Sequence, residues 1–233
     1  MKYLFSLATI SFLILSCSNS DTKMTLSGQV KGLKKGTLLL QKIEDTLLVS
    51  VDSVLVNGDS SFEFSEEITC PEMYYLYVRL KDGTLKDDRV SFFAEPGEIN
   101  IKTTLKNFQV DARITGSKNE AALDEYKKLV RRYTSKNLDY IQENFEALKS
   151  GNDSLVAAIT KQQKSLIASK YFTAVNFALN HNDYELAPYL MLSEVSDANV
   201  KYLDTVYSNL TPKIKDSKYG KALESFIVKR KNE

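Results

Sequence analysis

The chain has 233 residues, with 31 Lys and Arg against 30 Asp and Glu, which gives a formal net charge of +1. This balance offers no electrostatic reason to bind nucleic acid or a charged membrane surface, so we expect no nucleic-acid partner. The length is ample for a buried core in one or two domains. One histidine and two cysteines are too few for a zinc site of the usual kind, and we predict no metal and no cofactor.

The first residues predict a secretory signal. A lysine at position 2 precedes a run from Leu4 to Leu15 that is apolar apart from small Ser and Thr residues. This run is too short to cross a membrane as a helix, which takes about 20 residues. Ile14-Leu15-Ser16-Cys17 resembles the bacterial lipobox, although Leu15 is less usual at its place. The resemblance implies cleavage before Cys17; the alternative is an ordinary secretory signal with a chance cysteine.

Lipid attachment follows from that resemblance. In lipoproteins the cysteine thiol carries diacylglycerol as a thioether, usually with a further acyl chain such as palmitate, and together these chains make a firm membrane anchor. We therefore expect residues 1–16 to be a signal peptide, Cys17 to carry lipid, and residues 17–24 to form a polar tether. Ser18 follows the cysteine; in enteric bacteria this favours the outer membrane. We expect a lipid-anchored protein of the cell envelope, on its periplasmic or surface face.

Residues 25–117 have the pattern of a β domain. Short apolar runs alternate with turn residues, which is typical of an antiparallel sandwich or a partly open barrel. Asn57-Gly58, before Phe62 and Phe64, is a hairpin signal. The run Met73–Val78 is apolar on both faces, so we expect a central strand with one face on the core and the other under the helical half. The predicted strands are Leu26–Val30, Thr37–Gln41, Leu47–Val56, Phe62–Phe64, Met73–Leu80, Val90–Ala94, Ile99–Leu105 and Val110–Ile114.

Residues 118–233 have a helical period and predict an all-helical domain, so the fold class is α+β. Asp153, Ser196 and Ser217 are the expected N-caps of three of its helices, and Pro188 fits the first turn of a fourth. The segment from Tyr171 to Leu179 is apolar nearly all round and should be buried. Two apolar stripes precede it: one has Ala121, Leu123, Tyr126, Leu129 and Val130, and the other has Leu138, Ile141, Phe145 and Leu148.

The ordered set of motifs over residues 26–117 resembles a known domain. Its pieces include Leu26-x-Gly28-x-Val30, Val51-Asp52-Ser53, Phe62-x-Phe64, Glu95-Pro96-Gly97-Glu98-Ile99 and Ile114-Thr115-Gly116-Ser117. The set is similar to the N-terminal domain of unknown function 4369 in Bacteroidetes thiol–disulfide oxidoreductase lipoproteins. In them a helical region follows, and then a thioredoxin-like domain with Cys-x-x-Cys. We expect the glycines to serve turns, Phe62 and Phe64 the core, and Asp52 a local turn or cap bond.

Dithiol chemistry is not expected, because the sequence ends at Glu233, where the thioredoxin-like domain would begin. With Cys17 acylated, Cys70 has no second thiol as partner. A partly buried, inert Cys70 is the preferred interpretation, and His181 is expected to be exposed or to cap a helix. Two carboxylate pairs, Glu66-Glu67 and Asp87-Asp88, are expected as solvated charge in loops. Three tyrosines, Tyr74, Tyr75 and Tyr77, could form a platform for a glycan, but core or interdomain packing is preferred.

Four positions match the Asp-Ser/Thr-apolar motif of Bacteroidetes O-glycosylation, namely Thr46, Ser53, Ser154 and Thr205. N-caps and strand starts favour the same residues, so both interpretations stay open. No catalytic residues are assigned. The function that we predict is a non-catalytic envelope lipoprotein that docks a partner protein or a ligand. The alternative is an accessory of a thiol–disulfide or peroxide-handling system that lacks its own thioredoxin-like domain. An unrecognised hydrolase would need a pocket with perturbed carboxylates, which the spacing does not show.

Overall fold

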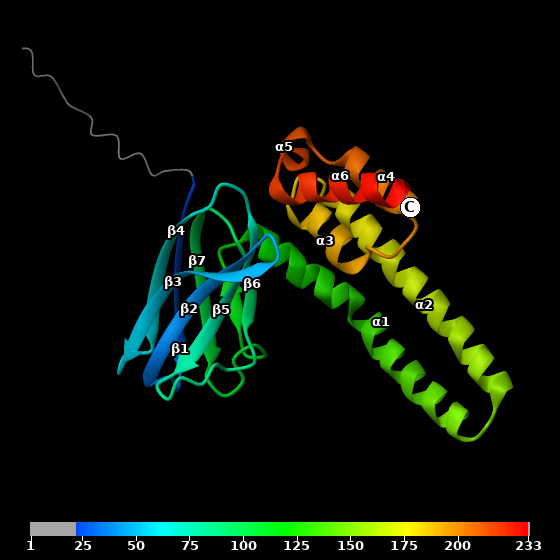
Figure 1. Ribbon diagram of the computed structural model, residues 1–233, viewed down its shortest axis with the longest axis horizontal. Helices are drawn as coiled ribbons and strands as arrows, with labels where there is room; N and C mark the ends of the chain where they lie inside the picture. The colour runs from blue at the N-terminus through cyan, green and yellow to red at the C-terminus, as the bar shows by residue number, and fades with distance from the viewer. Residues whose placement is uncertain (1–21, 233) are drawn as a thin grey trace, which may run out of the picture.

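The computed structural model describes residues 22–232 (Figure 1), so the predicted signal peptide and Cys17 lie outside the described residues. The described part holds strands first and helices after them. The strands are β1 (Lys23–Lys31), β2 (Lys35–Glu44), β3 (Leu47–Asn57), β4 (Ser61–Glu67), β5 (Glu72–Leu80), β6 (Val90–Ala94), β7 (Gly97–Thr104) and β8 (Arg113–Thr115). The helices are α1 (Lys118–Lys149), α2 (Asp153–Asn180), α3 (Leu186–Glu194), α4 (Val200–Asn209), α5 (Pro212–Lys215) and α6 (Lys218–Lys231).

The strands form two four-stranded sheets, with the orders β4-β1-β7-β8 and β3-β2-β5-β6. Alternate side chains of both sheets, such as Leu26, Leu38, Leu76 and Ile101, are buried in one apolar core between them. The α+β class is therefore confirmed, and the β region is a sandwich of two open sheets, not a closed barrel. All eight predicted strands are present, although the last begins at Arg113 and not at Val110.

Two details of the predicted topology are wrong. Strand β1 pairs with β7 in parallel, with Leu26 opposite Ile99, while the other strand pairs are antiparallel. Asn57-Gly58 does not close a hairpin, because β3 and β4 belong to different sheets and this turn carries the chain across the sandwich. The tight hairpin lies at Asp45-Thr46 between β2 and β3, where Asp45 has φ of 54°. Asp tolerates this left-handed conformation better than most residues.

Gly28 does not serve a turn as expected; it lies in the middle of β1. A Cβ atom there would lie 2.0 Å from the carbonyl oxygen of Ile101 in β7 and 2.7 Å from the ring of Phe62 in β4. Glycine therefore allows both neighbouring strands to approach β1 closely. Phe62 and Phe64 are buried as predicted, and Asp52 Oδ1 accepts a local hydrogen bond from the Ser53 amide.

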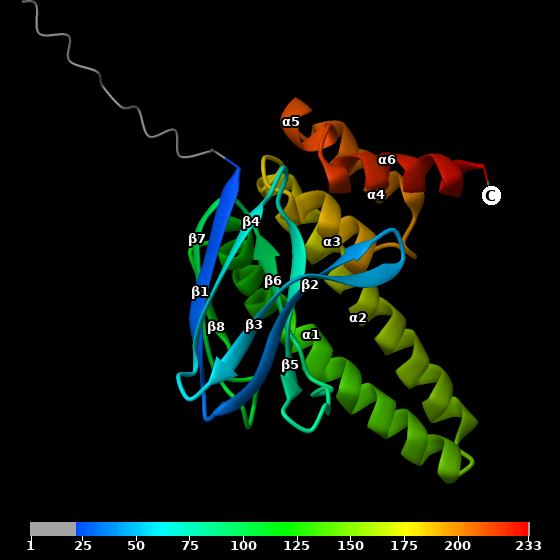
Figure 2. The ribbon, with the colours of Figure 1, turned by 60° about the vertical axis from the view of Figure 1, so that its left-hand side comes forward.

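Helices α1 and α2 form a long antiparallel hairpin whose far end projects away from the sandwich, while α3 to α6 pack around its near end (Figures 1 and 2). The predicted cap Ser217 is correct, but Asn152 and Asn199, not Asp153 and Ser196, accept the capping bonds of α2 and α4. In both cases another residue with a cap-forming side chain lies nearby, so spacing alone did not decide between them. No helix within residues 22–232 is long and apolar enough to cross a membrane.

The helices cover only one end of β5. Met73 on β5 and Phe93 on β6 belong to the helical core. The Phe93 ring packs edge-on against the rings of Tyr189 and Tyr219, with ring centroids 5.2 and 6.4 Å apart. Farther along β5, Tyr77 is half-buried and its hydroxyl accepts a hydrogen bond from Arg89. The expectation that β5 has both faces covered is thus confirmed at the Met73 end.

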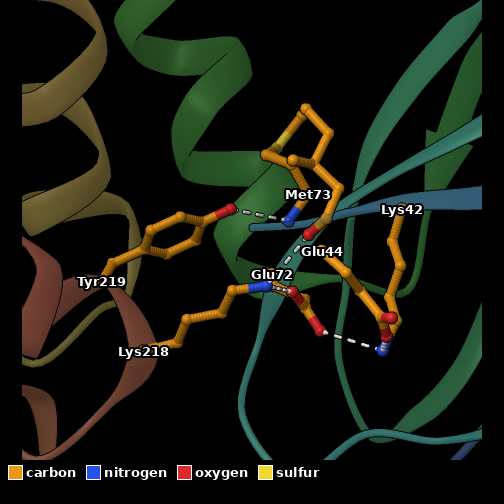
Figure 3. A network of polar contacts seen from close by, with 7 residues as sticks. Lys42, Glu44, Glu72, Met73, Lys218 and Tyr219 are labelled. Atoms are coloured by element: carbon orange, nitrogen blue, oxygen red, sulfur yellow. Dashed lines mark hydrogen bonds and ion pairs between the residues drawn. The ribbon is translucent and has the colours of Figure 1, made fainter. Parts of the chain in front are cut away.

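The start of α6 is inserted where β2 and β5 separate (Figure 3). Their pairing ends at Lys42 opposite Tyr74, so the register would place Ile43 opposite Met73. Instead, the Met73 amide donates to Tyr219 Oη at 3.0 Å, and the Ile43 carbonyl accepts from Lys218 Nζ at 3.4 Å. Glu72 pairs with Lys218 and lies 3.9 Å from Lys42. Side chains of α6 thus replace the next rung of the ladder and join the helices to the sandwich.

Replacing Tyr219 with Phe should therefore weaken the fold. The ring packing would remain, but the part-buried Met73 amide would lose its acceptor, which costs about 1–2 kcal/mol of unfolding free energy. Tyr140→Phe is the matched control, since that residue is half-buried and its hydroxyl makes no hydrogen bond within residues 22–232. Urea denaturation measures both variants. Equal stability of the two would show that the Tyr219 hydroxyl contributes nothing.

Candidate docking groove between the sandwich edge and helix α1

One edge strand of each sheet lies on the side of the sandwich where α1 begins. Strand β8 ends one sheet and β6 ends the other, and the chain passes from β8 into α1 after two residues. An exposed sheet edge presents unpaired backbone groups, so it must be covered or left available to a partner. The first turn of α1 covers part of this side, and what lies beyond it is the candidate site.

Three buried side chains, Glu95, Asn119 and Glu120, fix the direction of α1; we call them the α1 clamp. Ser117 caps the helix by accepting from the Glu120 amide at 3.0 Å. Glu120 Oε2 accepts at 2.9 Å from the Phe93 amide on the edge of β6. In a capping box a glutamate at this place reaches back to the cap residue; here it satisfies a sheet edge instead.

The other two members of the α1 clamp link three segments. Glu95, in the turn between β6 and β7, accepts from the Lys118 amide and, at 2.6 Å, from Asn119 Nδ2. Asn119 Oδ1 in turn accepts from the Leu186 amide at the start of α3, at 3.1 Å. Buried polar groups that are all paired specify one arrangement, because any other would leave them without partners. The α1 clamp therefore sets α1 and α3 against the sandwich.

Two of the buried carboxyl groups have perturbed acidity. Burial raises the pKa of Glu120 above its ordinary value of 4.5, and the nearby Lys127 ammonium opposes the rise. Burial likewise raises the pKa of Glu185 at the start of α3, opposed by the hydrogen bond from the Ser217 hydroxyl. Both groups already have protein partners, so their perturbation follows from their structural roles and does not identify an acid or base of a reaction.

The groove lies between these strand edges and α1, with a cavity of about 680 Å³. Its strand wall comes from Val90 and Ser91 of β6 and from the segment 112–115, and its helix wall from α1. This volume is within the range of small-molecule sites, about 300–1,000 Å³. The charged residues of the lining are Arg113, Glu120, Asp124, Lys127, Lys128 and Arg131.

Cations predominate around the groove. Lys127 is paired with Glu120 and Asp124, at 3.6 and 3.8 Å. Within residues 22–232, no ion pair is recorded for Arg113 or Arg131, which face the groove from β8 and α1. Arg113 donates one hydrogen bond to the Ala112 carbonyl at 3.0 Å. Guanidinium groups that lack an ion pair in the described residues, one on each wall, favour a ligand that carries carboxylate or phosphate groups. The groove is thus suited to bind an anionic group.

Comparison with known proteins identifies the sandwich. Residues 24–123 match the family described as Domain of unknown function (DUF4369). The sandwich and the start of α1 are a DUF4369 domain. The match confirms the resemblance seen in the sequence, and it extends past β8 to include all of the α1 clamp.

The other comparisons are sparse. No curated protein matches the sequence. A solved structure titled pT26-6p aligns with 84% of this chain at 12% sequence identity, with a TM-score of 0.23. This chain spans 42% of the length of that one.

The residues singled out in the sequence do not converge on the groove of the DUF4369 domain. Cys70 is a half-buried free thiol in the loop between β4 and β5, and His181 is the C-cap of α2. Tyr74 is buried in the sandwich core, while Tyr75 and Tyr77 are half-buried beneath the Arg89 guanidinium, so the three form no common platform. No group of three or more metal-ligating side chains occurs in the described part of the chain.

The carboxylate pairs and the glycosylation candidates are also separate from the groove. Glu66-Glu67 ends strand β4 and does not lie in a loop, whereas Asp87-Asp88 does, and Asp88 accepts from Lys86 and from the Gln109 amide. The four glycosylation candidates, Thr46, Ser53, Ser154 and Thr205, are all exposed. Sequence reasoning missed Arg113 and Arg131, because only the fold brings β8 next to the middle of α1.

Substitutions at Glu120 test the α1 clamp. Glu120→Gln keeps an oxygen for the Phe93 amide, whereas Glu120→Ala leaves that buried donor unpaired and should destabilise the protein by about 1–3 kcal/mol. The folded-state pKa of Glu120 is raised, so its contribution to stability is complete below the unfolded pKa and is lost as pH rises through the folded value. As the pH is raised from 4 to 7, the unfolding free energy of Glu120→Gln should therefore increase relative to that of the native protein.

Urea denaturation at both pH values measures these differences. The interpretation would be contradicted if Glu120→Ala were as stable as Glu120→Gln. It would also be contradicted if the native protein became more stable relative to Glu120→Gln as the pH rose.

Proposed function

We propose that this chain is a non-catalytic lipoprotein of the cell envelope, held to the outer membrane by lipid on Cys17, that docks a partner protein. The observation that carries the docking role is the cation-rich groove between the sheet edges and α1, with Arg113 and Arg131 on opposite walls, neither of them in an ion pair within residues 22–232. The buried carboxylates beside it are already committed to backbone amides. The groove therefore offers recognition chemistry, and its buried carboxylate, Glu120, is held by the Phe93 amide.

The geometry suits a protein docked outside the membrane. Strand β1 begins six residues after Cys17 (23 − 17), and a chain of that length can span at most about 20 Å. The sandwich would then lie close to the membrane. The α1–α2 hairpin points away from the end of β1 at which the described chain begins (Figure 1). An anchored molecule would thus present the hairpin and one side of the groove to soluble partners.

A second candidate is an accessory role in a thiol–disulfide or peroxide-handling system. It is favoured by one observation: Cys70 is only half-buried, so its thiol is not enclosed by the core. In this role the Cys70 thiolate would attack the disulfide of an oxidised thioredoxin-like protein, forming a mixed disulfide and releasing the second cysteine of that protein as a thiol. O-glycosylation at Thr46, Ser53, Ser154 or Thr205 would be compatible with either role.

One experiment tests anchor and docking together. The full chain is produced in a Bacteroidetes host with a photo-crosslinking residue in place of Lys128 in the groove, or in place of Val110 as an exposed control. We expect the protein in the membrane fraction, an intact mass that includes lipid on Cys17, and one discrete adduct from position 128 only. Arg131→Glu should reduce that adduct, since it reverses a groove charge.

Three results would decide otherwise. An unacylated thiol at Cys17 would overturn the anchor. Adducts equal at positions 128 and 110 would overturn the groove as the docking site. A discrete adduct that disappears on reduction and requires Cys70 would support the redox accessory instead, and added mass in hexose-sized steps would reveal glycosylation.

A further inference from the structure

Helix α1 carries two seams of side chains with alternating spacings of three and four residues. The covered seam is Tyr126, Val130, Tyr133, Asn137, Tyr140, Asn144 and Ala147. The bare seam, one residue farther along, is Lys127, Arg131, Thr134, Leu138, Ile141, Phe145 and Leu148. Such spacing repeats every seven residues, about 3.5 per turn, and is the pattern by which one helix packs along another.

The covered seam packs against α2. The rings of Tyr126 and Phe177 have centroids 5.5 Å apart, the hydroxyls of Tyr133 and Thr173 are 3.1 Å apart, and Gln163 donates to Asn137 at 2.9 Å. The covered seam therefore packs along another helix, as its spacing predicts. It also shows that the projecting half of the hairpin is joined largely through polar groups, because Ala147 and Ile159 are the buried apolar residues of its far end.

Apart from Thr134, which lines a cavity shared with α2 and α3, the bare seam has no helix against it within residues 22–232. All seven of its side chains are exposed, and Leu138, Ile141, Phe145 and Leu148 expose 62%, 50%, 64% and 61% of their surface. Single exposed apolar residues are ordinary, but four in register along one helix face form a contiguous apolar patch, which marks an interaction site. The other end of the seam, Lys127 and Arg131, lines the groove. One face of α1 thus joins a cationic groove to an apolar stripe.

We propose that the bare seam binds an amphipathic helix of a partner protein, with carboxylates in its first heptad and apolar residues at the seam positions of the next two. The inference deepens the proposed docking role and rests on it. Charge complementarity decides the occupant, because Arg131 makes no ion pair within residues 22–232 and favours a carboxylate, while Lys127 already has Glu120 and Asp124 as partners and adds positive charge beside it. The apolar end favours aliphatic or aromatic side chains. Carboxylates are most favourable at a helix N-terminus. The partner helix therefore runs parallel to α1, with its N-terminus in the groove.

A second copy of this chain fits the bare seam less well. Parallel pairing of two bare seams would bring Arg131 against Arg131. Antiparallel pairing centred on the apolar stripe would bury that stripe but would supply no carboxylate to Arg131. A dimer would therefore leave the charged half of the seam unused.

The test uses the full-length chain in lipid nanodiscs and a fluorescent synthetic peptide of three heptads, with Glu at the seam positions of the first heptad and Leu at those of the next two. Fluorescence anisotropy measures binding, with empty nanodiscs as the blank. Phe145→Asp and Arg131→Glu should each weaken binding at least about tenfold. Their matched controls, Val110→Asp and Arg132→Glu, place the same changes on exposed residues outside the seam and should leave binding unchanged. Circular dichroism verifies that all variants are folded.

Charge exchange supplies a gain of function. A peptide with Lys in place of the Glu residues should bind the native chain weakly and the Arg131→Glu variant more tightly; Lys127 is left unchanged because it pairs with Glu120 of the α1 clamp. Absence of binding to the native chain, or equal binding by Phe145→Asp and Val110→Asp, would overturn the helix partner. So would a sedimentation-detected dimer that Phe145→Asp dissociates, since the seam would then be self-complementary. If the groove adduct at position 128 persisted in any of these cases, the docking role would stand and only its helical occupant would fall.

Discussion

The α1 clamp is the interaction on which the rest of the arrangement depends. Glu95, Asn119 and Glu120 are all buried, and each accepts a hydrogen bond from a backbone amide that would otherwise be unpaired. Leaving such a donor or acceptor unpaired in the interior costs about 1–3 kcal/mol, so the clamp is much weaker in any other geometry. It fixes where α1 leaves the sandwich, and thereby which face of α1 meets α2, which lines the groove and which stays bare.

This constraint divides the molecule into parts of unequal stability. Near the sandwich, α1 and α2 are buried against α3, α4 and α6 through residues such as Tyr126, Phe177 and Leu190. At the far end, Ala147 and Ile159 are the buried apolar side chains of the two helices. Elements with few buried apolar contacts open at low free energy, and binding sites are often drawn from them. A partner helix on the bare seam would supply the third face that the hairpin lacks.

Much of this architecture is readable in the sequence, and the failures have definite causes. Alternating apolar residues predicted all eight strands, since a half-buried strand has a period of two. The parallel pairing of β1 with β7 was not predictable, because five strands, β2 to β6, lie between the two in the sequence. The sequence predicts a turn role for Gly28, because the real requirement for glycine there, the close approach of the Ile101 carbonyl, exists only in the folded sheet. The caps Asn152 and Asn199 compete with neighbours of equal local preference.

The candidate site was the least predictable part. Arg113 and Arg131 are far apart in the chain and are brought together only because the α1 clamp directs the helix past β8. The apolar stripe from Leu138 to Leu148 was visible in the sequence, but its exposure was not, since the same spacing describes a buried helix face. The family match covers the sandwich and the clamp and assigns no activity, so the groove and the bare seam provide the argument for function.

The most direct test of the account is a distance distribution between spin labels on the sandwich and on the far half of α1. Spin labels would be attached to the variants Val110→Cys and Gln142→Cys in a chain that also carries Cys17→Ser and Cys70→Ser. Double electron–electron resonance would then report the direction of α1. The account predicts one narrow distribution that broadens in Glu120→Ala and stays narrow in Glu120→Gln. A broad distribution in the labelled chain that retains Glu120 would contradict the account, because α1 would then have no fixed direction relative to the sandwich.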